Sequence, residues 1–396
     1  MENNNHNLIF WGVCLILFLP TIVLPPDFQP SAFSRTLLFR IIVTLLVCFL
    51  CFKFFYKKET SFSAPKWKSS VYLPALILAA FFIILALSAL FSQDIRFSVF
   101  GSPARAGGVL NLLFFLIFTV ILALFISENS WKKLFNLLFI AGILDSLLAV
   151  IQYFKIFKNV FISFESGGTP SFLGNSTFLA IYMLFLTLLS LTFFLQEKEK
   201  KKKWLYAGLF LLFAFTILIT GARAAYLGML AGLFFFIFFY PKKLKRLKIA
   251  AASFVLLAVI AVVFFNFFPQ IAEKNGLLKI AAHRLSVKNV AQDLFGTRFS
   301  VWKISLQMIK DKPILGWGPE NFYIGFEKYY DPANPLVKNL WWDRPHNAFL
   351  DIAASSGIIS AVLYSLFWIF LLWQLQKFKR QQGDNPHTYL AHGLQA

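Results

Sequence analysis

The chain has 396 residues, of which 58% are hydrophobic and only 14% are charged, and its mean hydropathy is +0.68. Soluble domains carry about a quarter charged residues, so this composition excludes an ordinary soluble protein. The formal net charge of +20 would suit a nucleic-acid partner, but more than half of the 38 basic residues lie in short clusters between apolar runs. We therefore interpret the charge as a signal of membrane topology, and we expect no nucleic-acid binding.

Apolar runs of about 20 residues recur along the chain, and a helix of this length crosses the bilayer core of roughly 30 Å. The first run has no basic segment before it and no small-residue cleavage site after it, so we interpret it as a retained helix rather than a signal peptide. The pattern predicts an all-α, polytopic transmembrane helical bundle embedded in a lipid bilayer. Its spans, about ten in number, are expected near residues 8–24, 36–56, 71–91, 108–126, 134–154, 175–195, 204–220, 224–240, 249–268 and 346–374.

Basic clusters occupy every second connection between these spans. Short loops that are rich in lysine and arginine stay in the cytoplasm, so both ends of the set of spans are predicted to be cytoplasmic. The remaining connections are then extracytoplasmic. The basic clusters lie within 53–68, 132–133, 198–203, 242–248 and 377–380.

One extracytoplasmic connection, residues 269–345, is far longer than the others. Residues 297–310 within it repeat apolar side chains at helical spacing, which predicts an amphipathic helix. Thr297 is a candidate N-cap, and Pro313 follows the expected end. The predicted apolar stripe consists of Phe299, Trp302, Leu306 and Ile309.

These features divide the chain into four predicted parts. Residues 1–268 form a transmembrane bundle of about nine spans, and residues 269–345 form an extracytoplasmic loop, or lid, with amphipathic helices. Residues 346–380 form the last span and a basic cytoplasmic end. An apolar pattern begins again within 381–396, which we interpret as the start of a truncated segment.

Three ionisable residues on the extracytoplasmic side are candidates for chemistry. Arg223 lies between two spans among small residues, where its guanidinium either faces a cavity or reaches lipid headgroups. Arg298 opens the amphipathic helix, where a bound anion would offset its conflict with the helix dipole; the alternative is a solvated arginine. His346, at the outer mouth of the last span, either accepts a proton near neutral pH or makes an ordinary hydrogen bond at the helix end.

The sequence contains no P-loop, no dinucleotide-binding GxGxxG after a strand, no HExxH and no CxxC spacing. No pair of carboxylates is placed as an obvious acid–base couple or as a metal-binding Asp-x-Asp motif. We therefore predict no metal site and no cofactor. Chemistry at this site would depend on arginines.

Six short segments between residues 95 and 375 follow one another in a fairly specific order. They are FGSPARAGG at 100–108, GTPSFLGN at 168–175, GAR at 221–223, GTRFSVW at 296–302, PILGWGPENF at 313–322 and HNAFL at 346–350. Together they resemble the O-antigen ligase and polymerase family of bacterial membrane glycosyltransferases. One departure is the setting of Arg223, which is Ala-Arg-Ala where the family usually has Ser-Arg-Gly.

The resemblance implies a protein of about twelve spans that transfers a glycan from an undecaprenyl-diphosphate carrier to a glycolipid, glycan or protein acceptor. The reaction would take place on the periplasmic or exterior face of the bacterial cytoplasmic (inner) membrane. Arg223 and Arg298 would hold the diphosphate, since guanidiniums make bidentate contacts with phosphate oxygens. Arg105 and Asn347 would also bind substrate. His346 would be the catalytic residue that deprotonates or orients the acceptor hydroxyl, with inversion at the anomeric carbon.

Several alternatives remain open at this point. Ligase, polymerase and protein O-oligosaccharyltransferase differ only in their acceptor, and no motif identifies the acceptor. A membrane transporter, of bicarbonate or of a lipid-linked glycan, is the alternative of another class. A transporter should bury charge or break helices near the bilayer midplane. Asp145 is the only acidic residue well inside a predicted span, which favours the enzyme.

Overall fold

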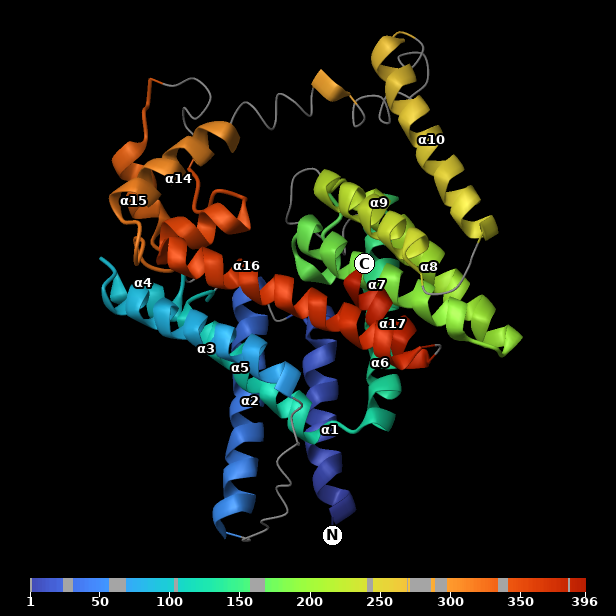
Figure 1. Cartoon of the computed structure of the whole chain (residues 1–396), viewed down its shortest axis with the longest axis horizontal. Helices are drawn as coiled ribbons and strands as arrows, with labels where there is room; N and C mark the ends of the chain where they lie inside the picture. Colours follow the sequence, from blue (N-terminus) through green and yellow to red (C-terminus); the bar gives the residue numbers. More distant parts are fainter. Residues whose placement is uncertain are drawn as a thin grey trace. The chain divides into compact units, whose positions relative to one another are not determined.

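The structure is a computed structural model of the chain, shown in Figure 1. Throughout the described part the chain is helical and contains no β-strand, so the predicted all-α class is confirmed there. The structure describes residues 2–23, 31–56, 69–102, 106–156, 168–240, 245–268, 270, 286–288, 298–333, 341–383 and 385–396.

Each predicted span coincides with a helix. Six helices are long and apolar enough to cross a membrane: α2 (Ser31–Tyr56), α3 (Ser69–Leu90), α6 (Glu128–Tyr153), α7 (Ser176–Gln196), α8 (Lys200–Thr220) and α16 (Ala348–Gln382). The other four helices are α1 (Glu2–Phe18), α5 (Val109–Phe125), α9 (Arg223–Phe238) and α10 (Lys245–Phe267). The first three of these four include shorter apolar helices, and the total of about ten spans stays a prediction.

The helices form two compact units. The first comprises Met1–Lys68, Ser102–Phe236 and Leu375–Ala396, and the second comprises Ser69–Gly101 and Ile237–Gln374. The long loop predicted at 269–345 therefore belongs to the second unit, together with α3 and most of α16.

The core of the first unit lies where α6, α7 and α8 pack against one another (Figure 1). Leu179 and Leu186 of α7 and Phe213 of α8 are fully buried there. A Cβ added to Gly142 of α6 would clash with Leu186, so this glycine permits the close approach of the two helices. Close packing of small and large side chains is the main attraction between helices in a bilayer, where burial from water contributes little.

A short C-terminal helix, α17 (Pro386–Gln395), packs against α7 in the same unit. It begins where the Asn385 side chain accepts a hydrogen bond from the His387 N–H, at 3.0 Å. His392 is completely buried. Its Nε2 donates to the carbonyl oxygen of Phe236 at 2.7 Å, so its Nδ1 is the acceptor for the ammonium of Lys379 at 2.8 Å.

The second unit is organised around a break in α16. At Gly357 the backbone has φ 86° and ψ 164°, which separates two helical parts. The segment 313–318 pairs with the break: Ile358 N donates to the Pro313 carbonyl at 2.8 Å, and Gly318 N donates to the Ser355 carbonyl at 2.7 Å. Irregular backbone is tolerated at membrane depth when other protein groups satisfy its hydrogen bonds, as they do here. The apolar pattern of the sequence predicts one span at 346–374, without this break.

The same segment is anchored to a short helix, α4 (Ile95–Phe100). Asp94 caps α4 by accepting a hydrogen bond from the Phe97 N–H at 2.8 Å. Ser98 donates to the Pro319 carbonyl at 2.8 Å, and Asn321 Nδ2 donates to Ser98 Oγ at 3.1 Å. These contacts hold the Gly/Pro-rich turn at residues 316–319 in place.

Candidate functional site

The predicted amphipathic helix of the long loop is present as α14 (Phe299–Asp311). Arg298 occupies the N-cap position, with φ −65° and ψ −41° and no side-chain cap. Thr297, the predicted N-cap, lies outside the described residues. Lys312 follows the helix, so Pro313 comes directly after its end, as expected.

The predicted apolar stripe of α14 is not the face that is buried in the protein. Phe299 and Leu306 of the predicted stripe are 43% and 50% exposed. The buried face lies beside the predicted one, because α14 packs against a second helix, α15 (Phe322–Tyr329), which the sequence analysis did not predict. The buried cluster consists of Val301, Ile304, Met308, Trp317, Phe322, Phe326 and Ala354.

His346 lies in a short loop directly before α16, and this loop is held in place by α14. The indole Nε1 of Trp302 donates to the carbonyl oxygen of Pro345 at 2.9 Å. His346 itself has φ +51°, in the left-handed region that few non-glycine residues adopt. Its imidazole stacks edge-on against Trp342, with 4.9 Å between ring centroids, and His346 is nonetheless exposed. The loop is therefore fixed while the imidazole stays accessible.

Arg298 is linked to the loop of His346 through α14. Residues four apart share a helix face, so Arg298 projects from the face of α14 that carries Trp302. Trp302 in turn binds the residue next to His346. Arg298 is exposed, as a residue that meets a ligand must be. An association of Arg298 with His346 at one site stays a prediction.

Asn347, predicted to bind substrate, serves as a helix cap. Its Oδ1 accepts hydrogen bonds from the N–H groups of Phe349 at 3.1 Å and Leu350 at 3.3 Å. These bonds satisfy two of the backbone donors that the start of α16 leaves free. A role for Asn347 in substrate binding stays a prediction.

Arg344 is a site residue that the sequence analysis missed. Its guanidinium makes ion pairs with two carboxylates, Asp351 Oδ2 at 2.8 Å and Glu320 Oε1. The Glu320 side chain is only 7% exposed, and its backbone has φ +62°. One fork-shaped side chain therefore ties the loop that carries His346 both to the turn before α15 and to the first turn of α16. The sequence feature that could have indicated this ion pair is an arginine two residues before His346 and an acidic residue five residues after it.

Arg223 stands at the hairpin between α8 and α9, as predicted. Gly221 ends α8 in the left-handed conformation, φ 78°, and α9 begins at Arg223. The Tyr226 hydroxyl donates to the Leu218 carbonyl at 2.6 Å, which joins the two helices. Arg223 is partly buried and belongs to the first unit. Its association with Arg298 and His346 stays a prediction.

Two arginines of α2, for which the sequence indicated no role beyond their charge, bind segments that carry the family resemblance. Arg35 donates to the carbonyl oxygens of Phe172 at 2.7 Å and Leu173 at 2.6 Å. Arg40 donates to the Ala106 carbonyl at 2.6 Å. Arg105, the remaining predicted substrate-binding residue, lies outside the described residues. Its neighbour Ala106 is fixed by Arg40.

Asp145, the acidic residue inside a predicted span, is completely buried in α6. Ser171 Oγ lies 3.2 Å from its Oδ1 and 2.7 Å from its carbonyl oxygen. Within the part of the chain that the structure describes, no three His, Cys, Asp or Glu side chains gather in a way that could hold a metal ion.

The described helices, six of them long and apolar enough to cross a membrane, define an integral membrane protein. Arg223 begins α9, Arg298 directly precedes α14, and His346 lies just before α16. A sequence model of the O-antigen ligase family matches residues 207–365, which confirms the predicted resemblance. The chain is also similar to the teichuronic acid biosynthesis protein TuaE of Bacillus subtilis (strain 168). The two are 28% identical over 221 residues, which cover 53% of this chain and 43% of the relative. The chain thus matches less than half of that relative's length.

Proposed function

We propose that this chain is a glycosyltransferase that moves a glycan from an undecaprenyl-diphosphate carrier to an acceptor hydroxyl. The acceptor would be reached on the extracytoplasmic face of the bacterial cytoplasmic membrane. The observation that carries the proposal is the O-antigen ligase match at 207–365, which contains Arg223, Arg298 and His346. The hydrogen bond from Trp302, one turn after Arg298 on α14, to Pro345, the residue before His346, supports it.

In the proposed reaction, the acceptor oxygen attacks the anomeric carbon as the bond from that carbon to the diphosphate oxygen breaks. His346 takes the hydroxyl proton, and the carrier diphosphate leaves with the bonding electrons. Negative charge therefore develops on the diphosphate, where the guanidiniums of Arg298 and Arg223 would stabilise it. Such preorganised donors contribute about 3–4 kcal/mol each to the stability of a transition state. A single displacement inverts the configuration at the anomeric carbon.

The proposal is tested by reconstituting the full chain with a radiolabelled undecaprenyl-diphosphate glycan and candidate acceptors. We expect Arg298→Ala and His346→Ala each to slow transfer by about a hundredfold or more. Lys303→Ala is the matched control for Arg298→Ala, because Lys303 is exposed on the same helix and its loss removes the same charge. Transfer at the wild-type rate by either site variant would contradict the assigned role of that residue.

A polymerase is the second candidate. The relative TuaE is named for the biosynthesis of teichuronic acid, a cell-wall polysaccharide, which favours a reaction in which one carrier-linked glycan is the acceptor for another. Donor supplied alone distinguishes the two reactions. A polymerase would give a ladder of longer carrier-linked glycans, whereas a ligase would leave the donor unchanged until another acceptor is added.

The transporter alternative draws on two features, the buried Asp145 and the broken helix α16. The same reconstitution separates it from both enzymes. A transporter would move the labelled donor across the vesicle membrane with its diphosphate linkage intact, whereas a transferase would release the carrier diphosphate from the glycan.

A further inference from the structure

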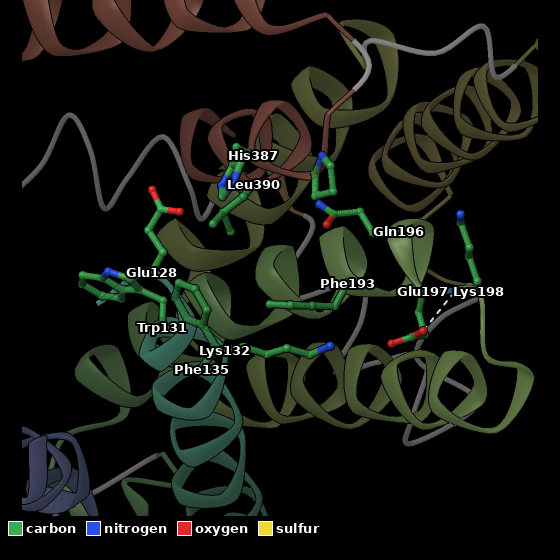
Figure 2. A pocket seen from close by; sticks show the side chains of 11 residues that line it. Glu128, Trp131, Lys132, Phe135, Phe193, Gln196, Glu197, Lys198, His387 and Leu390 are labelled. Carbon is green, nitrogen blue, oxygen red and sulfur yellow. Dashed lines mark hydrogen bonds between the residues drawn. The ribbon is translucent and has the colours of Figure 1, made fainter. Parts of the chain in front are cut away.

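A cavity of about 640 Å³ lies in the first unit between the beginning of α6, the end of α7 and α17 (Figure 2). Its volume falls within the range of about 300–1,000 Å³ that is typical of ligand sites. The candidate catalytic residues do not line it. The residues that do are Glu128, Trp131, Lys132, Phe135, Phe193, Gln196, Glu197, Lys198, Pro386, His387 and Leu390.

One part of the wall is aromatic. The rings of Trp131 and Phe135 are 6.0 Å apart between centroids, and those of Phe135 and Phe193 are 5.8 Å apart. In Figure 2, Trp131 and Phe135 lie on one side, the amide of Gln196 lies on the other, and Phe193 lies between them. These rings pack on the core of the first unit, so the wall is rigid and apolar.

The opposite part of the wall offers hydrogen-bond donors and positive charge. Gln196 Nε2 is buried and, among the described residues, has no hydrogen-bond partner. A buried donor without an acceptor costs about 1–3 kcal/mol, so a ligand that supplies an acceptor oxygen would be favoured. Lys132 and Lys198 line the same cavity.

Two carboxylates, Glu128 and Glu197, line the same cavity, and Glu197 is held in place by hydrogen bonds to the backbone. Its Oε1 accepts hydrogen bonds from the N–H groups of Glu199 at 3.1 Å and Lys198 at 3.0 Å. These hydrogen bonds, with the nearby charge of Lys132, hold the pKa of the Glu197 carboxyl below its ordinary value. Glu197 therefore stays ionised as part of the turn before α8. The lining therefore has no net charge, and Lys132 and Lys198 are the groups in it that can bind an anionic part of a ligand.

We propose that this cavity binds one glycerophospholipid, with its headgroup phosphate between Lys132, Lys198 and Gln196 and its upper acyl chains against Trp131, Phe135 and Phe193. A phosphate diester supplies the acceptor oxygens that the amide and the ammonium groups require. The lysine-rich helix ends place the cavity at the cytoplasmic leaflet under the positive-inside rule. Tryptophan is also enriched at this depth of a bilayer.

Native mass spectrometry of the full chain in detergent tests the ligand class, with four probes added in turn. Phosphatidylglycerol and phosphatidylethanolamine should each bind saturably. Diacylglycerol with the same chains lacks the phosphate, and inorganic phosphate lacks the chains, so each should bind at least about tenfold more weakly. Equal binding of diacylglycerol would show that the cavity binds acyl chains and does not recognise the phosphate. Displacement of phospholipid by inorganic phosphate at equal concentration would show that the cavity binds any small anion and does not recognise the acyl chains. Either result overturns the proposal.

Substitutions of two neighbouring lysines test whether the phospholipid binds in this cavity. Lys132→Gln should weaken phospholipid binding by about tenfold, because it removes a charged contact with the phosphate. Lys133→Gln makes the same change of charge at the next residue, which is exposed and does not line the cavity, and it should leave binding unchanged. Equal effects of the two substitutions would show that only the general charge of the surface matters, and would overturn the proposal.

Gln196→Leu gives a second and independent measurement. The substitution removes a buried amide donor that has no partner among the described residues, so the thermal stability of the lipid-free protein should not fall. Phospholipid binding should nevertheless weaken by several-fold. Unchanged binding by a stable Gln196→Leu variant would overturn the assigned contact between this amide and the phosphate.

Discussion

The indole of Trp302 donates a hydrogen bond to the carbonyl oxygen of Pro345, 2.9 Å away and 43 residues later in the chain. This bond joins α14, the helix that begins after Arg298, to the residue that precedes His346. Arg298 lies one turn before Trp302 on the same helix face. The relative position of the arginine and the histidine therefore depends on a contact made by neither of them.

The first prediction concerns this hydrogen bond. Trp302→Phe keeps an aromatic ring in place but removes the Nε1 donor. We expect the loss of about 1 kcal/mol of stability and a fall of roughly tenfold in the rate of glycan transfer, since small misplacements of reacting groups slow catalysis strongly. Thermal unfolding in detergent and the reconstituted transfer assay measure the two effects.

Trp317→Phe is the matched control for this prediction. Trp317 Nε1 donates to the Met308 carbonyl at 3.0 Å inside the buried cluster, and not to the loop of His346. The control should lose a similar amount of stability while transfer falls no further than the loss of folded protein explains. If the two variants lose stability and activity in the same proportion, Trp302 has no special role in positioning His346.

The second prediction concerns Arg344, which pairs with both Asp351 and Glu320. Arg344→Lys keeps the charge but cannot present two parallel donors to two carboxylates. Glu320 is buried and loses its partner, so we expect a loss of about 1–2 kcal/mol, reduced from the cost of a fully buried pair because Arg344 is 36% exposed. Transfer should fall through kcat more than through KM, since the loop of His346 loosens.

Arg380→Lys, near the C-terminal end of α16, controls for the Arg344 substitution. It should change neither stability nor transfer. A variant Arg344→Lys that matches wild type in kcat would show that the two ion pairs are not needed to position His346.

The arrangement of helices along the chain followed well from the sequence. Apolar runs of membrane-spanning length give a strong signal, and each predicted run coincides with a helix. The hairpin at 221–223 followed from a glycine and small residues between two such runs. Local composition was sufficient in these cases, because each element is specified by its own residues.

Features that depend on contacts between distant segments were not predicted. The buried face of α14 is decided by α15, since two adjacent faces of α14 carry apolar residues and only packing selects between them. The break in α16 is decided by segment 313–318, which pairs with it. A signal was present in Ser355-Ser356-Gly357, small residues in an otherwise apolar span, but its meaning depends on a partner more than 30 residues earlier.

The third prediction tests the break itself. A Cβ at Gly357 would clash with the Ile314 carbonyl, and its φ of +86° is strained for other residues. Gly357→Ala should therefore destabilise the second unit by about 3 kcal/mol or more, in the upper range of single substitutions. Gly383→Ala is the control, because Gly383 also has a positive φ, +62°, but among the described residues beyond its chain neighbours no atom lies within 4 Å of the added Cβ. It should cost about 1 kcal/mol. Equal losses would show that the pairing with segment 313–318 is not tight.

The last prediction concerns His392, completely buried between the Phe236 carbonyl and the ammonium of Lys379. Burial, the main cause, together with the charge of Lys379 lowers the pKa of His392 to about 4. The unfolded chain, with a histidine pKa of about 6.5, therefore takes up this proton first as the pH falls. Stability from the neutral imidazole is fully present above about pH 6.5 and is lost progressively down to about pH 4, by about 3 kcal/mol in total.

Thermal unfolding in detergent between pH 7.5 and pH 4.5 measures this loss as a difference between variants. Carboxylates titrate in the same range, so the slope of the wild type alone is not diagnostic. His392→Gln keeps one donor for Phe236 and one acceptor for Lys379 but does not titrate, so its stability should depend less on pH. His387→Gln, on the exposed side of the same helix, should keep the full wild-type slope. If His392→Gln loses stability with acid as steeply as wild type does, the buried imidazole does not govern the acid sensitivity of the first unit.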